Sequence, residues 1–186
     1  MPFKAQVVWE RFVTAIKIDK IPFNLDISHR LHYYSIMEKA EDIQKQLREL
    51  FATQSLAVLA THNEEQPYAS LVAFVATEDL KHIYFATPKT TRKFANLTAD
   101  GRVALLVNNS TNQSADFHQA IAVTAVGDAE EITGSDREQQ LLHYLAKHPY
   151  LEEFAKSPTC ALVRVTARSY YLVKNFQKVL EYHLVK

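Results

Sequence analysis

Short runs rich in β-branched and aromatic residues constrain the fold of this 186-residue chain more than any other feature. Each run has the length of a strand and an alternating or near-continuous apolar pattern, and polar segments separate it from the next. The runs cover residues 56–61, 68–76, 82–87, 102–108, 120–131, 160–166 and 169–174. Helical patterns stand singly between them. We therefore expect a mainly β fold, an antiparallel barrel with a few peripheral helices, and not a doubly wound parallel sheet.

Helical patterns are found before and between these runs. Apolar residues recur at helical spacing over residues 38–52, and a short helical segment precedes the run at 102–108. Ser135 and Glu138 have the spacing of a capping box, which predicts that a helix starts at this point.

Residues 1–36 differ from the rest of the chain. They hold two of the six prolines and a stretch at 29–34 with little periodicity, although Val8, Phe12 and Ile16 have the spacing of one helix face. We expect an N-terminal extension over residues 1–36 and a barrel domain over residues 37–186. The extension is either an added arm or the result of an upstream start assignment.

The composition excludes several functional classes. The 21 basic residues equal the 21 acidic ones, so no overall positive field attracts nucleic acid or a membrane surface. Only 3 glycines occur, far below the average of roughly 7%. Neither glycine-rich phosphate loop can be written with them, so side chains must hold any phosphate. With one cysteine, Cys160, and no export segment, a cytoplasmic protein is expected.

The segment over residues 82–100 contains the best candidate binding site. An apolar strand and Pro88 are followed by the start of a helix. The hydroxyl group of Thr91 and the cations Arg92 and Lys93 gather at this point. Hydroxyls, cations and free helix N–H groups are the donors that a phosphate monoester requires. The alternative is that Thr91 only caps the helix while both cations lie on a solvated face.

The stretches QPYASLVAFV and HIYFATPKTTRKFANLTADGRVALLV resemble the FMN-binding split barrels of the pyridoxamine 5'-phosphate oxidase-like family in order, spacing and residue type. The resemblance runs from about residue 47 to residue 130 and continues more weakly to the C-terminus. It implies a split β-barrel that forms a homodimer, with FMN bound between the subunits. It also implies a flavin-dependent oxidoreductase that acts on an unknown small-molecule substrate.

The resemblance assigns cofactor contacts to three groups of residues. The backbone of one strand would lie along the flavin ring, a second group would bind the FMN phosphate, and an asparagine-rich loop would reach the flavin of the other subunit. These groups are Ser70, Leu71, Val72 and Ala73; Thr87, Thr91, Arg92 and Lys93; and Asn108, Asn109 and Asn112. For the asparagines, the alternative is a turn of residues that tolerate left-handed geometry. No catalytic residue is assigned.

The chain departs from true pyridoxamine phosphate oxidases at charged positions. Those enzymes have an arginine where this chain has Ser70 and a lysine where it has Val75, and they end in a motif with Trp and Arg that is missing here. The resemblance is closer to uncharacterised FMN-binding relatives, so vitamin B6 oxidation is not expected.

Two other functions stay open. Related split barrels bind haem through an axial histidine, for which His118, His143 or His183 is available, although the Thr and Arg-Lys set favours a flavin. The protein could also be a non-enzymatic module that stores, senses or presents a flavin or deazaflavin. A metal site is not expected, because Asp116 and His118 have no third ligand nearby in the sequence.

Overall fold

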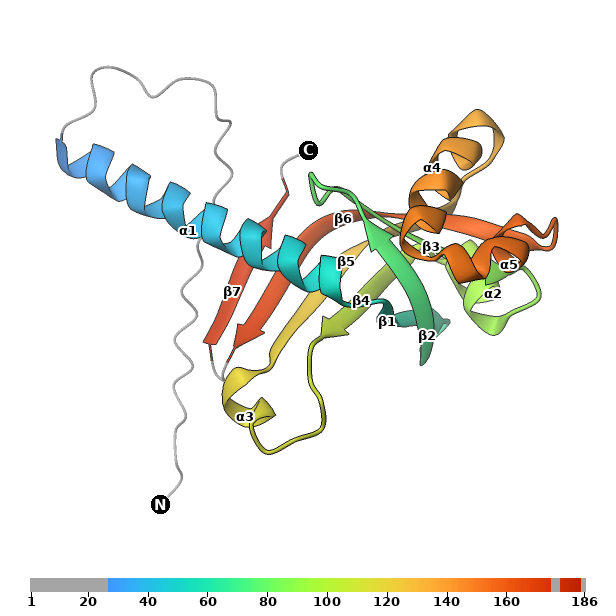
Figure 1. Ribbon diagram of the computed structural model, residues 1–186, viewed down its shortest axis with the longest axis horizontal. Coiled ribbons are helices and arrows are strands. Elements are labelled where there is room, and N and C mark those ends of the chain that lie inside the picture. Colours follow the sequence, from blue (N-terminus) through green and yellow to red (C-terminus); the bar gives the residue numbers. More distant parts are fainter. Residues whose placement is uncertain (1–26, 175–177, 185–186) are drawn as a thin grey trace.

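The computed structural model describes residues 27–174 and 178–184 (Figure 1). The helix expected around Val8, Phe12 and Ile16 lies outside the described residues. The elements follow the chain in the order α1 (Ile27–Thr53), β1 (Leu56–Asn63), β2 (Gln66–Ala76), β3 (His82–Pro88), α2 (Arg92–Ala99), β4 (Arg102–Asn108), α3 (Asp116–Gln119), β5 (Ile121–Glu131), α4 (Gly134–Lys147), η1 (Pro149–Leu151), α5 (Glu152–Lys156), β6 (Cys160–Lys174) and β7 (Lys178–His183).

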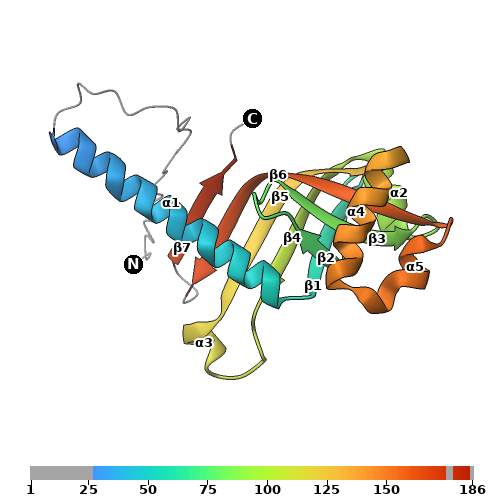
Figure 2. The same cartoon turned by 45° about the horizontal axis from the view of Figure 1, so that its top comes forward.

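Six antiparallel strands close into a barrel. The sheet order is β3-β2-β1-β4-β5-β6-β7, and β3 also pairs with β6, which joins the two sides of the sheet. Strand β7 lies outside the closed ring and pairs with β6 (Figures 1 and 2). The expected mainly β split barrel with peripheral helices is confirmed.

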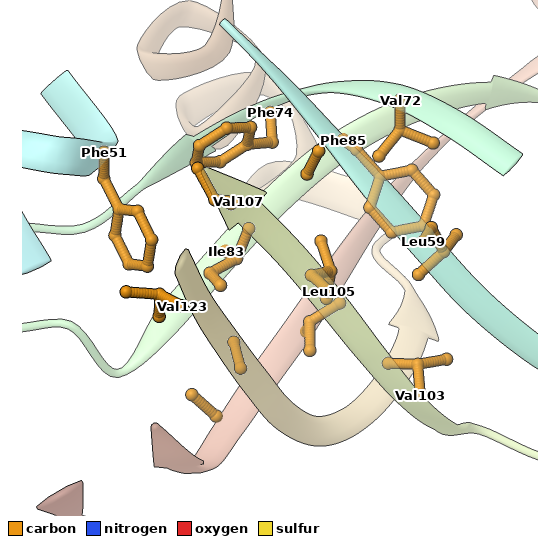
Figure 3. Close-up of a cluster of buried hydrophobic side chains, with 14 of the residues drawn as sticks. Phe51, Leu59, Val72, Phe74, Ile83, Phe85, Val103, Leu105, Val107 and Val123 are labelled. Atoms are coloured by element: carbon orange, nitrogen blue, oxygen red, sulfur yellow. The ribbon is translucent and has the colours of Figure 1, made fainter. Parts of the chain in front are cut away.

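Alternate residues of each strand fill the barrel interior, as the pleat of a strand requires. Leu59, Phe74, Phe85 and Leu105 come from four different strands, and each is fully buried (Figure 3). The opposite residues face outward. Burial of these apolar side chains is the main favourable contribution to folding.

Strand β6 corrects one prediction, because the runs at 160–166 and 169–174 form a single strand. Its pairing with β5 shifts where Val126 pairs with Ser169 and Gly127 pairs with Ala167, so Arg168 is an extra residue. Such a bulge reverses which face successive side chains point to. The change of phase in the sequence pattern was therefore mistaken for a break between two strands.

Helix α1 is longer than predicted. It begins at Ile27, so the stretch at 29–34 is helical, and the helix continues across the expected boundary between residues 36 and 37. Its last turns bury Leu47, Leu50 and Phe51 in the barrel core. The division into an extension and a barrel domain stays a prediction.

The segment between β5 and β6 forms a helical layer outside the barrel. Tyr144 of α4 lies in a second buried cluster with Tyr84 of β3 and Val75 of β2. The predicted capping box is wrong, because α4 begins at Gly134 and its N-cap residue is Thr133. Ser135 therefore lies inside the first turn. In the part of the chain that the structure describes, no helix has both the length and the apolar character needed to cross a membrane.

Candidate functional site

Strands β2 and β3 are not paired with each other along most of β2. Strand β2 pairs with β1 from Gln66 to Ala73 but pairs with β3 only from Phe74 to Ala76. We call residues 67–73 of β2, on the side away from β1, the split edge. This edge is the opening in the barrel.

Backbone groups of β2 point toward this opening. Phe74 N–H donates to Ser55 O, ahead of β1, whereas Thr77 N–H donates to His82 O of β3. Because successive residues of a strand alternate in direction, the N–H and C=O groups of Leu71 and Ala73 face the split edge. A planar ligand with donors and acceptors on its rim could pair with them as a missing strand would.

The side chains of the four β2 candidates point in different directions. Val72 is buried in the core, and Leu71 is 59% exposed on the outer surface. Ser70 is half-buried, and its Oγ is buried with no hydrogen-bond partner among the described residues. A buried hydroxyl without a partner is uncommon in a folded protein. Ser70 Oγ therefore has an unused hydrogen-bonding capacity near this opening.

Two threonine hydroxyls meet where β3 ends. Thr87 is buried, and its Oγ1 lies 3.1 Å from Thr91 Oγ1. Thr91 is the N-cap of α2, since its Oγ1 accepts from Phe94 N–H at 3.4 Å, and it also donates to Pro88 O at 2.8 Å. Thr91 therefore caps α2, as the alternative interpretation of this segment expected.

The cations around these hydroxyls differ in their partners. Lys89 Nζ lies 2.7 Å from Glu131 Oε1 and is therefore neutralised. Arg92 is exposed, and its guanidinium carbon lies 5.3 Å from the centroid of the Tyr68 ring on β2. Lys93 is half-buried beside it. The structure thus brings Thr87, Thr91 and the first residues of α2 to the same end of the barrel as the start of the split edge.

A buried polar contact anchors α2 at this end, and sequence reasoning missed it. Asn96 Nδ2 donates to Thr61 Oγ1 at 3.0 Å, and Thr61 Oγ1 donates to Tyr68 O at 3.4 Å. Asn96 and Thr61 are both buried. The available signal was Asn96 beside Leu97, a polar residue on the buried face of a short amphipathic helix.

An ion pair between Asp100 and Arg102 lies at the C-terminal end of α2. Hydrogen bonds from Arg102 hold the pKa of Asp100 well below its ordinary value, and His62 Nε2 lies 3.2 Å from the same carboxylate. This anion is a helix length away from Arg92. Because Arg102 pairs with this carboxylate, Asp100 is neutralised as Lys89 is by Glu131.

The asparagines lie at the other end of the barrel, after β4 (Figures 1 and 2). Asn108 Oδ1 accepts from Ser110 N–H at 3.0 Å, and Asn109 Oδ1 accepts from Ile121 N–H at 2.8 Å. Asn112 has a φ of 59°, in the left-handed region. These contacts organise the turn. The structure does not bring the asparagines to the α2 end within one chain.

The three candidate histidines are also dispersed. His118 is exposed on α3, and His143 Nε2 lies 3.4 Å from Ala76 O. His183 lies between Ser169 Oγ, at 2.8 Å, and Glu181 Oε2, at 3.1 Å. This cross-strand array on β6 and β7 was not predicted, and it lies on the outer face of the sheet. No group of three or more His, Cys, Asp or Glu side chains is placed to hold a metal within residues 40–174 and 179–184.

Comparison with known proteins identifies a family. A family model described as Pyridoxamine 5'-phosphate oxidase matches residues 43–174, which include both strands of the split and all of α2. The search of curated proteins finds no match.

Solved structures share the fold at low sequence identity. A heme binding protein from Mycobacterium smegmatis has a TM-score of 0.67 at 16% identity, over 75% of this chain and 57% of that one. A fad-binding protein from Mesorhizobium loti has a TM-score of 0.55 at 15% identity, over 67% and 89%. A putative pyridoxamine 5'-phosphate oxidase from Listeria innocua has a TM-score of 0.55 at 12% identity, over 74% and 98%. The chain therefore spans just over half of the Mycobacterium protein.

Proposed function

The chain belongs to the pyridoxamine 5'-phosphate oxidase family, and on that premise we propose that it binds FMN along the split edge and acts as a flavin-dependent oxidoreductase on a small molecule. One observation carries the proposal. The free backbone edge of β2 begins at the hydroxyl and arginine cluster of Thr87, Thr91 and Arg92. A flat ring and a terminal phosphate fit such an edge and such a cluster.

The residues present suit the phosphate of FMN. Arg92 offers a forked set of N–H donors and Lys93 adds a point charge beside the start of α2. The Thr87 and Thr91 hydroxyls, whose protons are directed to Thr91 Oγ1 and Pro88 O, would turn toward a bound phosphate in order to donate to it. Glycine loops are not needed for this arrangement. FMN is therefore favoured over riboflavin, which lacks the phosphate.

The β2 backbone would hold the ring. The N–H and C=O groups of Leu71 and Ala73 would orient it, and the buried Ser70 hydroxyl would gain the hydrogen-bond partner that it lacks. When bound, a flavin supplies hydride acceptor chemistry of its own. The protein then needs to place the substrate and exclude water.

The substrate is proposed to be other than a vitamin B6 phosphate. Ser70 provides no cation at the split edge. Val75 is buried beneath α4 in the same cluster as Tyr144, so a side chain at this position faces the helix. An anionic substrate would lose water without gaining a charged partner at either position.

We also propose a homodimer, assembled through the outer face of the sheet. Leu71, Val58 and Leu106 form a row across β2, β1 and β4, and Leu71 and Leu106 are 59% and 39% exposed. Contiguous exposed apolar residues of this kind are typical of protein interfaces. Across the interface, Asn108, Asn109 and Asn112 would approach the flavin of the partner subunit. With its single cysteine, such a dimer suits a cytoplasmic location.

An absorption spectrum of the purified protein tests the proposed cofactor. Two bands in the near-ultraviolet and blue are expected, and equilibrium titration should rank FMN above riboflavin and FAD. An intense Soret band would instead support the haem alternative, to which the Mycobacterium heme binding protein gives precedent. Binding of FMN without reduction by any donor would support a non-enzymatic flavin module.

A further inference from the structure

Tyr68 and Arg92 meet at the open end of the barrel. Arg92 is the first residue of α2 and is exposed, and its guanidinium carbon lies 5.3 Å from the centroid of the Tyr68 ring on β2. We propose that Tyr68 is a positioning residue that holds the Arg92 guanidinium ready for a terminal phosphate, and that it thereby sets the preference for a phosphomonoester over its dephosphorylated form. This inference rests on the proposed FMN site and adds Tyr68 to it.

The backbone of Tyr68 is tied to the same helix. Tyr68 O accepts from Thr61 Oγ1, and Thr61 Oγ1 accepts from Asn96 Nδ2. Asn96 follows Arg92 by four residues, so the two side chains lie on one face of α2. Helix α2 is therefore linked to Tyr68 in two ways, to its main chain by Asn96 through Thr61 and to its ring by Arg92. The link to the main chain keeps the Tyr68 backbone at a set place beside α2, within reach of Arg92.

The contact with the ring leaves the phosphate-binding edge of Arg92 free. An aromatic ring attracts a cation through its π face. A phosphate is instead bound by N–H groups in the plane of the guanidinium, two at a time. Within the described residues, no hydrogen bond or ion pair engages these N–H groups of Arg92. Arg92 can therefore keep its contact with Tyr68 while it binds an anion.

Restraint of Arg92 before binding should raise affinity for the phosphate alone. An unrestrained arginine loses rotamer freedom when it binds an anion, and this loss weakens binding. The Tyr68 ring removes part of that freedom in the free protein. Riboflavin has no phosphate, so its affinity should not depend on where Arg92 lies.

Two substitutions separate the ring from the hydroxyl group. Tyr68→Leu removes the π face and keeps apolar bulk, whereas Tyr68→Phe keeps the ring. In equilibrium titrations followed by flavin fluorescence, Tyr68→Leu should weaken FMN binding about two- to fivefold and leave riboflavin binding unchanged. Tyr68→Phe should bind both ligands as the parent does. Equal losses for both ligands in Tyr68→Leu, or an FMN loss in Tyr68→Phe, would overturn the proposal.

A double-mutant cycle tests whether Tyr68 acts through Arg92. When Arg92→Ala is already present, adding Tyr68→Leu should not weaken FMN binding further. A further loss of the same size would mean that the ring acts independently of Arg92, which contradicts a positioning role.

A measurement without cofactor separates this inference from the proposed function. In ¹⁵N-labelled apoprotein, the heteronuclear NOE of the Arg92 Nε–H group should be high in the parent and in Tyr68→Phe, and clearly lower in Tyr68→Leu. If the parent binds neither flavin, the FMN proposal fails while this comparison still tests the restraint. An unchanged NOE in Tyr68→Leu would overturn the positioning role even if FMN binds.

Discussion

Arg92 is the side chain on which phosphate recognition most depends. Arg92→Ala should remove a charge-assisted contact of about 1.5 to 3 kcal/mol, which is about ten- to a hundredfold in FMN affinity. Riboflavin affinity should barely change. Lys89→Ala is the matched control, because its ammonium already pairs with Glu131 at 2.7 Å and should contribute much less. Equilibrium titration of both variants measures the difference, and an Arg92→Ala protein that binds FMN as the parent does would disprove the phosphate assignment.

A second single-residue effect concerns the core. Tyr170 is fully buried, and its hydroxyl donates to Leu80 O at 2.6 Å. Leu80 has a φ of 60°, so this bond supports a left-handed turn. Tyr170→Phe leaves a buried carbonyl without its partner and should lower the free energy of unfolding by about 1 to 3 kcal/mol. Tyr182→Phe is the control, since its hydroxyl is less buried. Urea unfolding of both should show the larger loss at position 170.

At the scale of single elements, the junction of α4 and β2 carries a pH dependence. His148 is buried, its Nε2 lies 2.8 Å from Phe74 O, and burial lowers its pKa from the ordinary value of 6.5. Below about pH 6.5 the unfolded chain binds a proton at this histidine that the native protein resists, so stability should fall as the pH falls. His148→Gln can still donate to Phe74 O but does not titrate.

The test compares thermal midpoints at pH 7 and pH 5. The midpoint of the parent should fall more over this range than that of His148→Gln, while the exposed His118→Gln should behave as the parent does. Burial also lowers the pKa of His82, which contributes in the same direction and is present in all three proteins. Equal falls in parent and His148→Gln would show that His148 is not kept neutral by the fold.

Individual elements also show what could be predicted from the sequence. Period-two patterns located the strands closely, and the run at 102–108 coincides with β4, because half-buried strands leave a direct mark. The bulge at Arg168 left only a phase change, which resembles a loop. The start of α1 and the strand β7 were missed, since their patterns are weak. For the site, the Thr and Arg-Lys cluster was visible as a contiguous motif, whereas Tyr68, Thr61 and Asn96 come together only through strand register.

At the scale of the whole molecule, the apolar row on the outer face of the sheet is the feature that the described part of one chain does not explain. Helix α1 packs on the inner face, where Phe51 contacts Tyr170 with ring centroids 5.8 Å apart. The outer face carries the row of Leu71, Val58 and Leu106, and among the described residues Leu71 and Leu106 are left 59% and 39% exposed. A second copy of the chain is the occupant that the proposed interface requires, and a two-fold interface places each residue on both sides of it.

Leu106→Arg tests this assembly. It introduces an unpaired charge from each subunit at the centre of the proposed interface, and should weaken the dimer by at least about 3 kcal/mol, or about a hundredfold. Leu142→Arg is the matched control, because Leu142 is more exposed than Leu106, at 71% against 39%, and lies on α4 outside the barrel. Sedimentation should give a dimer for the parent and for Leu142→Arg, and a monomer for Leu106→Arg. If the flavin lies between subunits, the monomer should also lose FMN, and a Leu106→Arg monomer that retains one FMN per chain would rule out a shared site.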